Sequence, residues 1–164
     1  MTSEQKVDTL VTPQMEEEKG VWKDERVSPP VSESDIRKWA IASYWPEKPP
    51  QLFWDHEYAK GTKWGGIIAP NDFNPFAWPV ERPPRQESNG PRSGRGQRGM
   101  NGGQVETFGV PMRPGDVITS RTRLKDWNER ETRLGLTLFT ETETEWRNQR
   151  GEHVKTRIST GIRY

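Results

Sequence analysis

An alternation of apolar and polar residues runs through the C-terminal half of the chain, and it limits the possible folds more than any other feature. From Val117 to Ile162, single valine, leucine and isoleucine residues are separated by threonine, arginine and glutamate. A period of two places successive side chains on opposite faces of a strand, and threonine favours that conformation. Turn-forming residues at 114–116, 127–129 and 148–151 divide the pattern. The sequence therefore predicts a meander of long antiparallel strands.

Helical patterns come earlier in the chain. Ser32 followed by Asp35 resembles a capping box, and apolar residues at helical spacing continue to Trp45, where a proline follows. Asp55 can cap a second, short helix that stops at Gly61. Helices first and strands afterwards predict an α+β fold, in which a helix lies against an antiparallel sheet.

The length of 164 residues fits one compact domain. Hydrophobic residues make up 29% of the chain and charged residues 30%, so an isolated domain has little apolar surface to bury. Eight tryptophans supplement the core, and a partner subunit would be a second source of apolar contact. We expect a mobile N-terminal segment over residues 1–19, a domain over residues 20–164, and an exposed loop rich in arginine, glycine and proline over residues 81–99.

Several functional classes are disfavoured by composition. The chain has no cysteine and a net charge of +1, which argues against disulfides and thiolate metal sites and gives no general attraction to nucleic acid or membranes. No apolar run approaches the roughly 18 residues of a membrane span. The histidines, His56 and His153, lack metal-ligand spacing. We expect a cytoplasmic protein without a bound metal or cofactor.

The segment Pro111-Met112-Arg113-Pro114-Gly115-Asp116-Val117-Ile118 follows the pattern P-x-x-P-G-D-x-I. Together with the glycine-rich segment at residues 65–70, it resembles the MaoC-like hydratase/dehydratase family, in particular its N-terminal dehydratase domain, over residues 20–164. The resemblance implies a hot-dog fold, a curved antiparallel sheet wrapped on a central helix. It also implies pairing into a double hot dog, with a thioester of coenzyme A (CoA) or acyl carrier protein at the pair interface.

Catalytic members of that family carry a motif of the form D-x-N-P-L/I-H, whose aspartate and histidine activate water. Aligning Leu52 with the aliphatic position of the motif puts Lys48 at the aspartate and Phe53 at the histidine. Phenylalanine has no proton to exchange, and lysine near neutral pH is a cation without an acceptor. We therefore predict no catalytic residue in this chain.

Four neighbouring residues are candidates for substrate binding. By resemblance, the amides of Gly66 and Ile67 precede the central helix and polarise the thioester carbonyl, and Asn71 takes the place of a hydroxyl residue. Asp72 could face the tunnel as a lone carboxylate, but capping of the next turn is the favoured interpretation. The dipeptide Asp55-His56 could form a displaced catalytic pair, although a helix cap explains Asp55 equally well.

The arginines Arg92, Arg95 and Arg98 lie in the predicted loop and allow three interpretations. A solvated loop is the simplest of them. A clamp for CoA phosphates is the second, since arginine matches phosphate geometry. A nucleic-acid tract is the least favoured, because no aromatic residues alternate with the arginines.

The hypothesis that follows is a subunit of a heteromeric enoyl-CoA hydratase or 3-hydroxyacyl dehydratase, catalytically incomplete alone. It would shape the acyl tunnel, while a smaller MaoC-type partner supplies the aspartate and histidine in a heterodimer or heterotetramer. A homodimeric hot dog that binds a thioester or hydrophobic ligand without turnover is the alternative. An enzyme of altered chemistry using Asp55, Asp72 or His56 is a third possibility.

Overall fold

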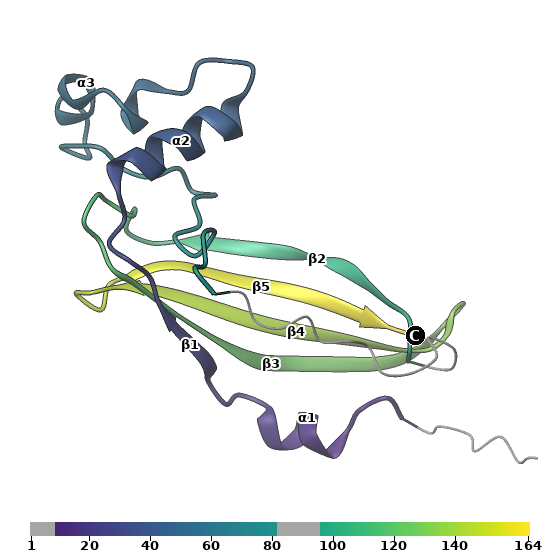
Figure 1. The fold of residues 1–164 in the computed structure, drawn as a ribbon. Coiled ribbons are helices and arrows are strands. Elements are labelled where there is room, and N and C mark those ends of the chain that lie inside the picture. Colours follow the sequence, from purple (N-terminus) through teal and green to yellow (C-terminus); the bar gives the residue numbers. More distant parts are fainter. Residues whose placement is uncertain (1–8, 82–95) are drawn as a thin grey trace, which may run out of the picture.

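The fold is built on one five-stranded antiparallel sheet, with strand order β1-β3-β4-β5-β2 (Figure 1). A computed structural model describes residues 9–81 and 96–164 of the chain. Short helices precede and follow β1. The elements in chain order are α1 (Pro13–Glu18), β1 (Lys23–Val27), α2 (Glu33–Tyr44), the single 3-10 turn η1 (Gln51–Phe53), α3 (His56–Lys60), β2 (Gly99–Phe108), β3 (Ile118–Thr132), β4 (Gly135–Asn148) and β5 (His153–Arg163).

The predicted meander is confirmed, with one error in its turns. Strands β3, β4 and β5 pair in sequence, and β2 adds to the outer edge of β5. The turn expected at residues 127–129 does not form. Instead β3 continues through a bulge between Leu124 and Asp126, and the chain reverses just before Gly135, whose φ of +88° suits glycine. The polar residues that suggested a turn lie in the extension of β3.

Both predicted helices form with the expected caps. The Ser32 side chain accepts a hydrogen bond from the Asp35 amide at the start of α2. The Asp55 side chain accepts one from the Tyr58 amide at the start of α3. Each cap provides an acceptor for an amide that has no partner within its helix.

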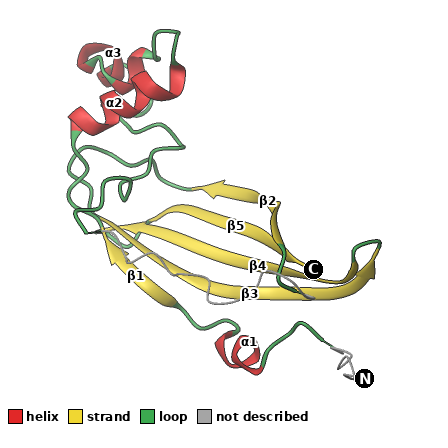
Figure 2. Cartoon of the chain, turned by 45° about the vertical axis from the view of Figure 1, so that its right-hand side comes forward, coloured by secondary structure: helices red, strands yellow, loops and turns green. Residues whose placement is uncertain are grey.

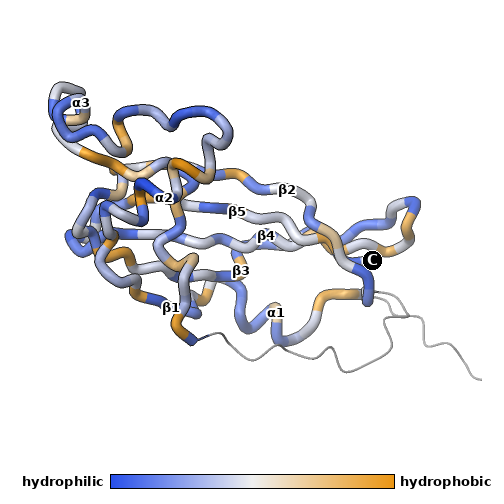
Figure 3. Tube along the Cα trace, turned by 45° about the horizontal axis from the view of Figure 1, so that its top comes forward, coloured by the Kyte–Doolittle hydropathy of each residue, from blue (hydrophilic) through white to orange (hydrophobic). Residues whose placement is uncertain are grey.

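The hydrophobic core lies at the end of the sheet where α2 and α3 gather (Figure 2). Ile36 and Ala40 on α2 and Ile118 on β3 are fully buried there. Along most of β4 and β5 the chain is polar or weakly apolar, as the pale and blue colours of Figure 3 show. The apolar residues are therefore concentrated in one part of the molecule.

The sequence motif P-x-x-P-G-D-x-I forms the turn that leads into β3. The Asp116 carboxylate is buried and accepts a hydrogen bond from the Arg113 amide at 2.8 Å. Gly115 has a φ of +87°, which explains the glycine. The aspartate of this motif thus has a structural role in holding the turn.

The central helix expected after Ile67 is not present. Between residues 61 and 81 the chain forms turns and irregular structure. Pro70, Pro75 and Pro79 lie in this segment, and each removes an amide donor that a helix would use. The sheet forms as expected, but the segment predicted to form a helix against it is irregular.

Of the segment predicted to be mobile, residues 1–8 lie outside the described part of the chain, and residues 9–19 make defined contacts. Thr12 caps helix α1, and the Leu10 side chain is 8% exposed. The Leu10 amide donates to the Glu129 carboxylate at 2.9 Å, and its carbonyl accepts from Arg163 at 3.0 Å. The folded structure therefore begins before residue 20. Of the expected loop at residues 81–99, residues 82–95 lie outside the described part of the chain, and Gly99 already belongs to β2.

Candidate functional site

Strand β2 ends and strand β5 begins at the end of the sheet nearest α2 (Figure 1). A pocket of about 200 Å³ opens there. Two chain segments form its walls, residues 68–71 and residues 108–112. Val154 and Lys155 of β5 also line it. A backbone hydrogen bond joins these walls, from the Ala69 amide to the Met112 carbonyl at 2.8 Å. The lining residues are Trp64, Ile68, Ala69, Pro70, Asn71, Phe108, Gly109, Val110, Pro111, Met112, Val154 and Lys155.

Gly109 allows the wall at residues 108–112 to lie close against β5. Its amide donates to the Val154 carbonyl, and the Val110 amide donates to the His153 carbonyl, both at 2.9 Å. A Cβ atom on Gly109 would lie 2.1 Å from the His153 carbonyl oxygen. A side chain cannot occupy that space, so the pocket wall in this form requires glycine.

Lys155 supplies the only titratable side chain among the pocket-lining residues. Its side chain is 4% exposed, and the ammonium group lies 4.8 Å from the centre of the Trp146 ring. The nearest oxygen atoms are the Asn71 carbonyl at 3.5 Å and the Glu106 carboxylate at 3.9 Å. Burial lowers the pKa of Lys155, although the Glu106 charge opposes this effect. The ammonium is thus held in surroundings that disfavour its charge.

Sequence reasoning did not single out Lys155. The residue occurs in the alternating pattern of β5, where lysine normally faces solvent. Only its register opposite Trp146 and the fold of the distant segment at residues 68–71 enclose it. No local signal in the sequence indicates this burial.

The structure brings two of the four predicted binding residues near the pocket. Asn71 lines it, and its main-chain carbonyl, not its side chain, faces the Lys155 ammonium. Asp72 is exposed and accepts a hydrogen bond from the Ser43 hydroxyl at 2.8 Å. The interpretation of Asp72 as a cap is wrong, because the side chain of Asn74 accepts from the amide of the following turn instead.

Gly66 and Ile67 do not precede a helix, so the helix dipole expected to polarise a carbonyl is missing at this place. Ile67 is buried in the core, and Gly66 lies beside the Arg113 guanidinium. Arg113 in turn donates to the Trp64 carbonyl at 2.7 Å. Binding of a thioester by the two amides stays a prediction, without the helix that motivated it.

The positions aligned with the catalytic motif lie apart from the pocket lining. Phe53 is 8% exposed and packs in the core, with its ring centre 6.0 Å from that of Tyr44. Lys48 is exposed, and its ammonium lies 4.6 Å from the Trp54 ring centre. The pattern D-x-N-P itself occurs at Asp72-Phe73-Asn74-Pro75, but Ala77 stands at the histidine position. Neither alignment yields an aspartate–histidine pair.

The displaced pair Asp55-His56 is used for local structure. Asp55 caps α3, and the His56 ring contacts the Glu33 carboxylate on the surface. The second histidine, His153, shares a hydrogen bond with the Thr156 hydroxyl at 2.8 Å. Within residues 9–81 and 96–164, no three His, Cys, Asp or Glu side chains lie close enough together to share a metal ion.

Of the three arginines proposed as a phosphate clamp, the structure describes Arg98 alone. Arg98 is exposed and pairs through its backbone with Tyr164, just before the start of β2. The pocket lies at the other end of that ten-residue strand, about 30 Å away at the usual rise per residue. Arg92 and Arg95 lie outside the described residues. In those same described ranges, no helix is long and apolar enough to cross a membrane.

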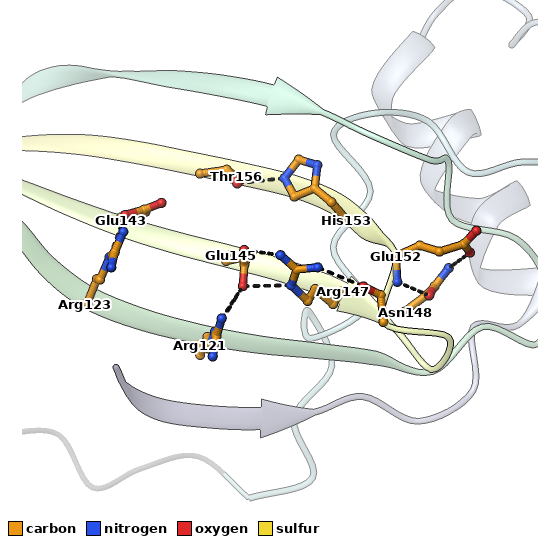
Figure 4. Close-up of polar contacts among 10 residues, drawn as sticks. Arg121, Arg123, Glu143, Glu145, Arg147, Asn148, Glu152, His153 and Thr156 are labelled. Carbon is orange, nitrogen blue, oxygen red and sulfur yellow. Dashed lines mark hydrogen bonds and ion pairs between the residues drawn. The ribbon is translucent and has the colours of Figure 1, made fainter. Parts of the chain in front are cut away.

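A ladder of ion pairs runs along β3 and β4 (Figure 4). The Glu145 carboxylate accepts from Arg121 at 2.8 Å and from Arg147 at 2.9 Å. The hydrogen bond from Arg147 is the main cause that lowers the pKa of Glu145, and Arg121 adds to it. Glu143 pairs with Arg123 one step along. These charges neutralise one another and leave no unpaired carboxylate for acid–base chemistry on this ladder.

Comparison with solved structures shows the fold at low sequence identity. A chain of the ChsH1-ChsH2 complex from Mycobacterium tuberculosis is 16% identical with a TM-score of 0.64, covering 88% of this chain and 89% of that one. A MaoC-like dehydratase from Rhodospirillum rubrum is 19% identical with a TM-score of 0.57, covering 86% and 90%. A chain of the HadBC (3R-hydroxyacyl-ACP dehydratase) complex from Mycobacterium tuberculosis is 17% identical with a TM-score of 0.55, covering 88% and 96%.

The sequence itself also identifies the family. A comparison with curated proteins finds no match. The FAS1-like, dehydratase domain region, however, matches residues 17–157, which is most of the chain. The antiparallel sheet agrees with this match and with the similar structures. The chain therefore belongs to the FAS1-like family of dehydratase domain regions and has a hot-dog fold similar to that of the MaoC-like dehydratase.

Proposed function

We propose that this chain is the tunnel-shaping subunit of a heteromeric acyl-thioester hydratase or dehydratase. A smaller MaoC-type subunit supplies the aspartate and histidine, and the substrate is an enoyl or 3-hydroxyacyl thioester of CoA or acyl carrier protein. One observation carries the proposal: Phe53, at the aligned histidine position, is packed in the hydrophobic core, and Lys48, at the aligned aspartate position, lies over Trp54 on the surface.

The chemistry explains why a second subunit is needed. Adding water across an enoyl double bond requires a base that takes a proton from water and an acid that gives one to the acyl chain. The pocket lining contributes one titratable side chain, Lys155, and no carboxylate or imidazole. A lone ammonium cannot perform both proton transfers.

An exposed edge strand supports the presence of a partner. Strand β2 lies at the edge of the sheet, and nine of its ten residues are exposed, which leaves backbone groups free for pairing with another chain. Met100, Val105 and Phe108 are apolar and exposed on this strand. Two of the similar structures are complexes, ChsH1-ChsH2 and HadBC. The combination favours a chain that completes its surface with a second subunit.

Reconstitution tests the proposal. The chain is co-purified with a smaller MaoC-type protein that carries the aspartate and histidine, and hydration of crotonyl-CoA is followed by the loss of enoyl absorbance. The complex is expected to be active, and replacement of the partner's motif histidine by alanine should abolish turnover. Full hydratase activity of the isolated chain would contradict the proposal.

A ligand-binding homodimer is the competing function, because the same exposed β2 edge could pair with a second copy. Light scattering of the purified chain, alone and with the candidate partner, separates the two. If the chain leaves its homodimer to form a complex with the partner, the role of a hydratase subunit is supported. A homodimer that ignores the partner and retains bound ligand favours the alternative.

A further inference from the structure

Lys155 is a buried cation that the proposed chemistry does not use. It lies on β5, its side chain is 4% exposed, and it lines the pocket between the ends of β2 and β5. An ammonium group carries three donors and no acceptor, and it is stable in an apolar place only when oxygen atoms approach it closely. The partners of Lys155 therefore decide whether the site is complete.

The oxygen atoms nearest to the Lys155 ammonium all lie beyond the usual length of a hydrogen bond. Hydrogen bonds between an ammonium and a carboxylate are usually about 2.7–2.9 Å long, but Lys155 lies 3.5 Å from the Asn71 carbonyl and 3.9 Å from Glu106. The Glu106 carboxylate is already engaged by Arg157, with both contacts at 2.7 Å. Among the described residues, no closer acceptor for the Lys155 ammonium is found.

The rest of the pocket is mainly apolar. Its apolar lining includes Trp64, Phe108, Met112 and Val154. Its volume of about 200 Å³ exceeds that of an apolar cavity of about 150 Å³ that accepts benzene. A molecule that fits would have a body about the size of one ring and a single negative group facing Lys155. Phosphate fits poorly, because it carries more charge than one ammonium balances and has no apolar body.

We propose that this pocket binds the carboxylate of a small organic acid, with Lys155 as its anchor. The carboxylate accepts hydrogen bonds from the Lys155 ammonium, and the apolar part of the acid lies against Phe108 and Met112. The carboxylate could be the distal end of an acyl thioester, and this assignment rests on the function proposed above. The substrates would then be thioesters whose acyl group ends in a carboxylate. A free acid of the same size is the other source of the same chemistry.

Titration of the purified chain with benzoate, with no partner or thioester present, tests the site itself. Benzoate is expected to bind saturably in calorimetry, and benzyl alcohol, which lacks the charge, to bind about tenfold to hundredfold more weakly, because one charge-assisted hydrogen bond contributes that much. Lys155→Met should remove the preference for benzoate. Lys125→Met is the matched control, because Lys125 lies on β3 in a surface ion pair with Glu141 and its loss should leave binding unchanged.

If Lys155→Met fails to fold, the thermal stability of the unmodified chain decides. Benzoate should raise its Tm, and an equal concentration of benzyl alcohol should raise it less. Equal effects of both compounds, or no binding of benzoate, would overturn the site. A preference for benzoate that survives in folded Lys155→Met would overturn the role of the lysine.

The reconstituted complex shows whether the carboxylate belongs to the acyl chain of a thioester or to a free acid. Hydration of an enoyl-CoA that ends in a carboxylate is compared with that of its methyl ester, and Lys155→Met should lower kcat/KM about tenfold or more for the acid alone. Equal kcat/KM for acid and ester in an active complex would overturn the assignment to the acyl chain. Benzoate binding by an inactive complex would support the pocket while refuting the hydratase function.

Discussion

Replacing Gly109 with alanine introduces one methyl group at the tightest point of the pocket wall. The new Cβ would lie 2.1 Å from the His153 carbonyl oxygen, 2.6 Å from the His153 ring nitrogen and 2.9 Å from its carbonyl carbon. Two of these three atoms are backbone, so no side-chain rotation relieves the overlap. The end of β2 must move away from β5.

The structure allows the cost to be worked out. Moving the strand end breaks two backbone hydrogen bonds, Gly109 to Val154 and Val110 to His153. Each contributes about 0.5–1.5 kcal/mol, and overpacking of this kind adds about 1–3 kcal/mol. The free energy of unfolding should therefore fall by about 2–6 kcal/mol. The pocket should also lose its preference for benzoate, since the wall that faces Lys155 is displaced.

Urea denaturation followed by tryptophan fluorescence measures the change. Gly99→Ala at the start of β2 is the matched control, because its Cβ would lie at an ordinary 3.5 Å from the Ile162 carbonyl. We expect an effect within about 0.5 kcal/mol. A loss below about 1 kcal/mol for Gly109→Ala, or equal effects of both substitutions, would refute the close approach as the reason for glycine.

Three further outcomes are expected. Phe53→Ala should lower the unfolding free energy by about 3–5 kcal/mol in urea denaturation, and a loss under 1 kcal/mol would show that Phe53 is not a core residue. Glu145→Gln should lower the free energy of unfolding by about 1–2 kcal/mol at neutral pH. Because the pKa of Glu145 is lowered, the difference between the variant and the unmodified chain should shrink as the pH falls below 4.5. A difference that stays constant with pH would contradict this. The pKa of Lys155 is lowered from 10.5 in the folded chain, so between its folded pKa and 10.5 the folded chain binds fewer protons than the unfolded chain. The free energy of unfolding should therefore rise with pH in this window. Lys155→Met should lack this rise.

Local patterns predicted much of the secondary structure. Ser32 and Asp55 cap the two helices as their spacing indicated, because capping depends on residues within three positions of each other. The strands from Ile118 to Arg163 follow the alternation of apolar and polar residues. The turn in β3 was misplaced, since polar residues on an exposed strand extension resemble a turn in composition.

The candidate site was only partly predictable. Asn71 does line the pocket, but through its backbone, and Asp72 bonds Ser43 on α2 instead of capping a turn. The absence of the catalytic pair followed from residue types, because Phe53 cannot exchange a proton in any conformation. The missing helix after Ile67 depended on how three prolines were accommodated, which residue spacing alone left open.

The sequence by itself determined the strands, the capped helices and the absence of an aspartate–histidine pair at the aligned positions, because periodicity, capping and proton chemistry are properties of neighbouring residues. Only the tertiary structure decided that Lys155 is buried. Its environment is made by segments more than 40 residues away in the chain, at Asn71 and Glu106. Burial of a charge depends on which segments pack over it, and that is a property of the whole fold.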